Sequence, residues 1–145
     1  AWGGEWACGR RVRGLRGGGF GAIATDHAPH TIGEKQCEYG RAASGIAGLE
    51  TALRAMMLLV HRGDLALDTM SRYLTVEPAR AMKLPGGTLR IGSPADVTIF
   101  DPDREWIVDP KKFISMGKNS PLAGVALRGK VTATIVGGKL VFNAD

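Results

Sequence analysis

Histidine and cysteine are scarce in this chain, which has three histidines and two cysteines among 145 residues. The cysteines, Cys8 and Cys37, do not form a C-x-x-C pair, which excludes the common cysteine frameworks for zinc or redox chemistry. We therefore expect both thiols to be reduced, as is usual in the cytoplasm. The chain has no apolar run near the roughly 20 residues of a membrane helix and no secretory signal pattern, so we expect a cytoplasmic protein without a membrane partner.

A strong charge of one sign is also missing from most of the chain. The net charge is +5, but four of the 19 lysines and arginines lie within the first 16 residues (Arg10, Arg11, Arg13 and Arg16). A basic tail can bind phosphate groups, yet a solvated terminus is the commoner explanation, so we expect no nucleic-acid partner. With 44% apolar and 23% charged residues, the composition is typical of one modest globular domain.

The first half of the sequence is typical of an α/β segment. Residues 1–19 contain seven of the 21 glycines and show no periodicity, so we expect an irregular lead-in there. The apolar run 20–26 predicts a buried strand of a parallel sheet, and residues 27–45 are expected to form a long functional loop.

Three helices are expected to complete the region of residues 20–87. Apolar residues at spacings of three and four between Ile46 and Val60 predict the first, with Ser44 as its N-cap and Gly63 just past its end. A second helix is predicted to begin at Asp68. A third follows Thr75 as its N-cap, with Pro78 in the first turn.

Residues 88–145 have the composition of short strands. The β-rich segments TLRI, DVTIF, EWIV, VALRGKVTATIV and KLVF are separated by the turn sequences GSP, DPD and GG. This alternation predicts a small antiparallel sheet that forms a second structural unit.

The stretch AIATDHAPH, residues 22–30, contains two of the three histidines beside an aspartate. Asp26 follows the predicted parallel strand, at the end where α/β barrels carry catalytic groups. Its carboxylate could bind a metal ion or move protons, and His30 could bind an anionic group or a metal. Alternatively, both side chains simply hydrogen-bond the backbone of the loop. The residue types alone leave both interpretations open.

The wider context resembles the dihydroorotases of the bacterial class I type, within the amidohydrolase superfamily. The resemblance rests on ATDHAPH, Glu34-Lys35, GIAGLET, GTLRIGSPADVTIFD and NSPLAGVALRGKVTATIVGGKLV, and covers roughly residues 20–143. DHAPH is its most specific part, since related hydantoinases and allantoinases usually lack the second histidine. The resemblance implies the carboxyl-terminal part of a metal-dependent (β/α)8 TIM-barrel hydrolase plus a small antiparallel β-sandwich segment.

The same resemblance implies an activity and a set of site residues. Such enzymes interconvert N-carbamoyl-L-aspartate and L-dihydroorotate in de novo pyrimidine synthesis. Asp26 matches the aspartate that contacts the metal centre and carries a proton from the hydroxide there to the departing amide nitrogen. His30 matches the histidine that holds the substrate carboxylate, and Ser44 and Gly45 match a pair whose main chain contacts the pyrimidine ring. Ser44 departs from the aromatic residue that is common at its position.

Other polar and sulfur-containing residues are expected to have structural roles. We expect loop ordering by His27, Glu34 and Lys35, a helix-terminal position for His61, a supporting buried acid at Glu50, and core positions for Met56 and Met57.

The ligands that such an enzyme needs for one or two zinc ions are largely missing from this sequence. The family supplies an H-x-H pair from the first barrel strand, and this chain has no H-x-H. A complete barrel needs about 250 residues. We therefore expect a carboxyl-terminal portion that is inactive alone and does not retain zinc.

The expected partners are the small-molecule substrate and either further copies of the chain or aspartate transcarbamoylase. Two alternatives stay open. One is a non-catalytic dihydroorotase-like subunit that supports aspartate transcarbamoylase, against which the presence of Asp26 and His30 argues. The other is a cyclic amidohydrolase of the hydantoinase or allantoinase type, against which His30 argues.

Overall fold

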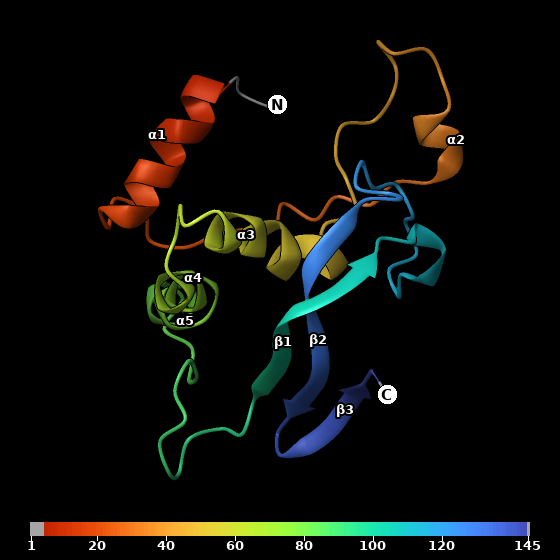
Figure 1. Cartoon of the computed structure of the whole chain (residues 1–145). Coiled ribbons are helices and arrows are strands. Elements are labelled where there is room, and N and C mark those ends of the chain that lie inside the picture. The colour runs from red at the N-terminus through yellow and green to blue at the C-terminus, as the bar shows by residue number, and fades with distance from the viewer. Residues whose placement is uncertain (1–4, 145) are drawn as a thin grey trace.

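The computed structural model describes residues 5–144, and the side chains of residues 9–144 (Figure 1). Within this range the helices precede the strands. The helices are α1 (Glu5–Arg16), α2 (Ile32–Lys35), α3 (Ala52–His61), α4 (Leu67–Leu74) and α5 (Val76–Ala81), with 3-10 turns η1 (Leu49–Thr51) and η2 (Pro110–Lys112). The strands are β1 (Val97–Ile107), β2 (Ala126–Val136) and β3 (Lys139–Asn143).

The strands form one antiparallel sheet in the order β1-β2-β3, which confirms the expected small antiparallel sheet. Gly137 and Gly138 both have positive φ, 55° and 77°, and join β2 to β3 in a tight hairpin that favours glycine. The DPD sequence does not separate two strands as expected, because β1 continues through it with a register shift between Asp101 and Glu105. TLRI lies outside the strands, and a second sheet layer is not found within residues 5–144.

The three predicted helices are present, but their starts differ from prediction. Helix α3 begins at Ala52 after η1, so Ser44 is not its N-cap. The reason is Gly45, whose φ of 126° is incompatible with a helix start. Gly63 follows the end of α3 with φ 74°, as predicted.

Helices α4 and α5 keep their predicted positions without the predicted capping bonds. Ala66, not Asp68, is the N-cap of α4, and the Asp68 carboxylate accepts the N–H of Thr69. Thr75 occupies the N-cap position of α5, but its hydroxyl donates to the carbonyl of Ser71. Pro78 lies in the first turn of α5, where its missing N–H needs no partner.

The irregular lead-in expected for residues 1–19 is wrong for Glu5–Arg16, which form α1. Packing against the rest of the chain stabilises this helix in spite of its glycines. Leu15 is only 9% exposed and belongs to the core, and Gly14 lies against the ring of Phe20. Residues 1–4 lie outside the described residues.

The predicted parallel strand over residues 20–26 is an extended segment without a strand ladder. A strand requires a hydrogen-bonded neighbour, and within the described range the nearest pairing is a single parallel bridge just after this segment, between His27 and Ile46. The N–H of Ile23 instead donates to the carbonyl of Tyr73 in α4. The segment is therefore positioned by helices, and it carries the chain directly to Asp26.

Two apolar clusters hold the molecule together. The first joins α1, α3 and α4 through Leu15, Met57, Leu65, Met70 and Tyr73, and Met56 packs against it. The second joins the sheet region to the segment before η1 through Ala47, Val108, Phe113 and Leu127. The core role expected for Met57 is confirmed, since it is 1% exposed. The second cluster places the β1–β2 connection beside the loop that carries the histidines.

Candidate active site

Asp26 lies exposed at the end of the extended segment. Its φ is 48°, in the left-handed region that aspartate and asparagine tolerate better than most residues. The resulting turn directs the next residue, His27, toward the start of η1. There the His27 Nδ1 accepts the N–H groups of Gly48 at 3.1 Å and Leu49 at 3.3 Å. His27 therefore orders the loop, as expected, and its Nδ1 is already in use.

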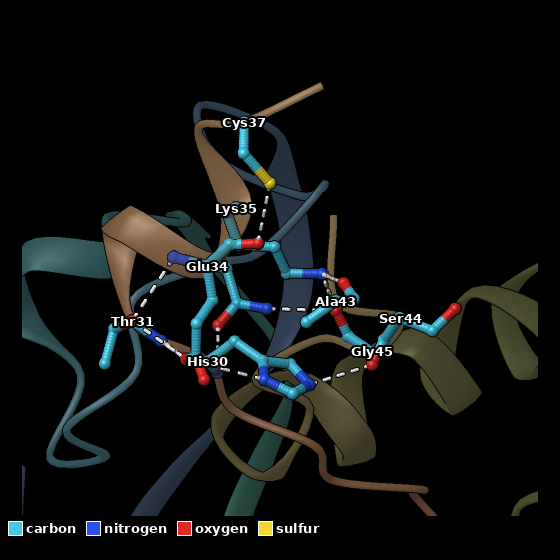
Figure 2. A network of polar contacts seen from close by, with 9 residues as sticks. His30, Thr31, Glu34, Lys35, Cys37, Ala43, Ser44 and Gly45 are labelled. Atoms are coloured by element: carbon cyan, nitrogen blue, oxygen red, sulfur yellow. Dashed lines mark hydrogen bonds and ion pairs between the residues drawn. The ribbon is translucent and has the colours of Figure 1, made fainter. Parts of the chain in front are cut away.

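His30 lies four residues further on, where three hydrogen-bonding groups surround it (Figure 2). Its ring Nε2 donates to the main-chain carbonyl of Ser44 at 2.8 Å, and its Nδ1 lies 3.7 Å from the Glu34 carboxylate. The main-chain N–H of His30 donates to Oδ1 of Asn119 at 3.1 Å. The fold thus brings His30 together with Ser44 and its neighbour Gly45, although Ser44 lies 14 residues away in the sequence.

The loop between His30 and Ser44 is ordered by its own polar residues. Thr31 and Glu34 form a capping box at α2, in which the N–H and hydroxyl of Thr31 both donate to the Glu34 carboxylate at 2.8 Å. The hydrogen bonds from Thr31 lower the pKa of Glu34, and the charge of His30 adds to this effect. Lys35 donates from Nζ to the carbonyls of Ala43 at 2.5 Å and Gly45 at 2.6 Å. Both Glu34 and Lys35 therefore order the loop, as expected.

Cys37 is a free, exposed thiol in this loop, and the side chain of Cys8 lies outside the described part.

Gly45 occupies a position that a larger residue cannot take. Its φ is 126°, and a Cβ there would lie 2.5 Å from the Cβ of Ala28 and 2.8 Å from its carbonyl oxygen. A hydrogen bond keeps the chain at Gly45 close to the chain at Ala28: the N–H of Ala28 donates to the carbonyl of Ile46 at 2.9 Å. The main chain of Gly45 is therefore presented directly beside the Asp26–His30 turn.

Two groups from other parts of the chain complete the surroundings of the loop. Asn119, in the β1–β2 connection, was not singled out by sequence, although the NSPLAG segment that contains it belongs to the resemblance. Glu50 accepts the N–H of Ser115 from the same connection at 2.8 Å. Burial alone raises the pKa of Glu50, but hydrogen bonding to Ser115 outweighs it, so its pKa lies below the ordinary value. Glu50 is thus the half-buried supporting acid that was expected.

The donor set does not amount to a zinc site. Among the described side chains, those of residues 9–144, no three histidines, cysteines, aspartates or glutamates lie close enough together to hold a metal ion. Zinc sites take three or four protein ligands, whereas Asp26 offers one carboxylate, and His27 and His30 are engaged by the loop.

His61 ends α3, as expected, and faces Asp103 at 3.5 Å. No helix in the described range is both long and apolar enough to cross a membrane.

The model of the amidohydrolase family matches residues 12–141. A dihydroorotase from Syntrophus aciditrophicus (strain SB) is 47% identical over 132 residues, which are 91% of this chain and 31% of that protein. A dihydroorotase from Anaeromyxobacter sp. (strain K) is 50% identical over 128 residues, 88% of this chain and 30% of that protein. The chain thus spans about 30% of the length of these relatives.

Solved structures also match the fold of this chain. The L-hydantoinase (dihydropyrimidinase) from Arthrobacter aurescens matches with a TM-score of 0.84 and 31% identity over 92% of this chain and 31% of that chain. The dihydropyrimidinase from Brevibacillus agri NCHU1002 matches with a TM-score of 0.87 over 96% of this chain and 32% of that chain. At 20% identity, the second likeness supports the fold alone.

Proposed function

The chain belongs to the amidohydrolase family, and from this premise we propose that it forms the carboxyl-terminal part of a dihydroorotase. The proposed reaction is the reversible, zinc-dependent cyclisation of N-carbamoyl-L-aspartate to L-dihydroorotate. In this proposal, the extended segment before Asp26 is the last strand of a (β/α)8 barrel, and the sheet β1-β2-β3 belongs to the small β-sandwich beside it.

One observation carries the proposal more than any other: His30, Ser44 and Gly45 converge at the turn that directly follows Asp26. L-Dihydroorotate has a carboxylate and a cyclic amide, which need a cationic or donor group and main-chain partners respectively. The His30 ring suits the carboxylate, since its Nε2 already carries a proton that it donates to Ser44. A substrate carboxylate would replace the Ser44 carbonyl as the acceptor of that proton.

Ser44 and Gly45 are proposed to bind the pyrimidine ring through their main chains. A main-chain contact does not require the aromatic side chain that relatives commonly carry at the position of Ser44. The Gly45 peptide is held in place by Lys35 and Asn119, which both donate to its carbonyl. A preoriented peptide binds the amide groups of the ring with a smaller entropic cost than a mobile peptide does.

Asp26 is proposed as the residue that transfers the proton. During hydrolysis, its carboxylate takes the proton from the attacking water and delivers it to the amide nitrogen as the ring C–N bond breaks. A zinc ion held in the complete enzyme would supply Lewis acidity at this site. Asp26 would provide one ligand, and the other ligands would come from residues outside 5–144.

The experiment uses the full-length protein purified with zinc and follows dihydroorotate in the ultraviolet. Asp26→Asn is the preferred variant, because asparagine keeps the shape and tolerates a φ of 48°. We expect kcat to fall by ~10²–10⁴-fold, the usual cost of losing a general acid–base group. The control is Asp103→Asn, which removes a carboxylate that is 80% exposed on β1, and it should keep the kcat of the unmodified protein.

Hydantoin and dihydrouracil, measured in parallel, test the hydantoinase alternative that the Arthrobacter aurescens structure suggests. Neither compound carries the carboxylate that His30 is proposed to bind, so we expect dihydroorotate to have the highest kcat/KM. A higher value for either competitor would reject the assignment. An unmodified protein without turnover, which stabilises aspartate transcarbamoylase instead, would establish the non-catalytic alternative.

A further inference from the structure

We propose that Asn119 is a positioning residue for substrate binding. It connects the sheet region to the two parts of the candidate site, the main chain at His30 and the main chain at Gly45. This inference rests on the proposed function and goes beyond it, because neither the DHAPH motif nor its neighbours include Asn119. The residue lies in the connection between β1 and β2, 89 residues from His30 and 74 residues from Gly45.

Both ends of the Asn119 carboxamide are used. Its Oδ1 accepts the main-chain N–H of His30 at 3.1 Å, and its Nδ2 donates to the carbonyl of Gly45 at 3.0 Å. Its main-chain carbonyl accepts the N–H of Ala47 at 2.8 Å. A carboxamide suits this position because it offers a donor and an acceptor at a fixed separation. Asn119 therefore ties the His30 backbone to the Gly45 backbone, which the loop 31–44 otherwise separates.

The segment around Asn119 is itself anchored, so it can serve as a fixed reference. Gly117 is buried against the loop, and a Cβ there would lie 2.4 Å from the Cβ of Pro29 and 3.1 Å from the nitrogen of His30. On the other side, Lys118 donates from Nζ to the carbonyl of Phe113, a 6% exposed member of the second apolar cluster. The sheet core thus determines where the amide of Asn119 lies.

The loop alone cannot replace this link. Lys35 ties the loop to Ala43 and Gly45, but the contact that joins the main chain of His30 to the rest of the molecule is the one from Asn119. Removing the carboxamide should let the His30 backbone and the Gly45 peptide move apart. The expected consequence is weaker substrate binding, while proton transfer by Asp26 is retained.

The test compares Asn119→Ala, Asn119→Asp and the control Asn143→Ala in the full-length enzyme. Asn143 is exposed at the end of β3, which makes it a matched amide outside the site. We expect Asn119→Ala to raise KM for dihydroorotate by ~10-fold or more, as for the loss of two partly buried hydrogen bonds, with a change in kcat below about 3-fold. Asn119→Asp has nearly the same shape, but it replaces the donor to Gly45 with a charged oxygen that repels the Gly45 carbonyl, so it should also raise KM even if the alanine variant folds poorly.

A double mutant separates positioning from a general structural role. If Asn119 acts partly through His30, then Asn119→Ala should raise KM much less in a His30→Ala background than in the unmodified enzyme. Full additivity of the two effects, or a KM no higher than that of Asn143→Ala, would overturn the proposal.

Hydrogen–deuterium exchange keeps this inference independent of the proposed function. Peptides covering residues 28–31 and 43–48 should exchange faster in Asn119→Ala than in Asn143→Ala, whatever the substrate of the enzyme is. Unchanged exchange in these peptides would contradict the positioning role. An unmodified protein without dihydroorotase activity, but with the expected exchange pattern, would reject the proposed function alone.

Discussion

The imidazole of His30 lies between a main-chain carbonyl and a carboxylate. The contact with the Ser44 carbonyl is short, at 2.8 Å, whereas the Glu34 carboxylate lies 3.7 Å away and is itself held by Thr31. The orientation of the ring therefore depends on a loop whose small helix α2 is stabilised by one ionised side chain. This dependence makes the local structure sensitive to acid.

Acid should loosen the loop through Glu34. Its pKa is below the ordinary value of 4.5, so ionised Glu34 stabilises the loop above pH 4.5 and this stabilisation is lost as the pH falls through the lowered pKa. Hydrogen exchange of residues 30–45, corrected for the intrinsic pH dependence, should increase as the pH falls from 6 toward 3.

Glu34→Gln is the control for this prediction, since glutamine can also complete a capping box but does not titrate in this range. In Glu34→Gln, the corrected hydrogen-exchange rate of residues 30–45 should stay nearly the same from pH 6 toward 3. An equally steep acid response in Glu34→Gln would show that another group is responsible.

Helix α3 connects the first apolar cluster to the sheet. On one side, Met57 packs against β2 at Gly129. On the other, the guanidinium of Arg54 stacks over the ring of Trp106 in β1, 3.1 Å from its centroid. Burial lowers the pKa of Arg54 to about 10, so the stacking contact partly replaces the water that this charge has lost. The packing of α3 thus fixes the base from which η1 and the site loop extend.

Gly129→Ala should disrupt this packing. A Cβ at Gly129 would lie 2.8 Å from Cγ of Met57, and the φ of 95° adds backbone strain. Gly92→Ala is a matched control, since Gly92 has a similar φ of 88° but nothing within 4 Å of the added atom. Denaturant unfolding measures the free energy of unfolding of each variant. We expect Gly129→Ala to lower this free energy by ~1–3 kcal/mol more than Gly92→Ala does, the usual cost of overpacking. Equal losses would mean that the backbone strain alone matters.

The whole molecule leaves many large apolar side chains uncovered. Ile91, Met116, Ile114 and Leu89 are each more than 80% exposed, and the extended segment before Asp26 forms no strand ladder with any described residue. Exposed apolar surface and unpaired backbone both favour association with other polypeptide.

The 145-residue chain expressed alone should therefore self-associate at micromolar concentration. The longer protein proposed above, in which a barrel would cover the segment 20–26, should be less prone to this. Light scattering on both proteins measures the difference. A monodisperse monomer of the 145-residue chain would contradict this expectation.

Local patterns in the sequence were enough to predict the bodies of α3, α4 and α5, the antiparallel sheet and the loop that carries Asp26 and His30. Apolar spacing, β-branched runs and turn residues act over a few residues, so they can be read without the fold. The structure differs where distant parts of the chain decide the outcome. Helix α1 forms against the core through Leu15, and the segment 20–26 has no ladder because a strand needs a partner. Asn119 reaches His30 and Gly45 across 89 and 74 residues, and no local pattern encodes contacts of that range.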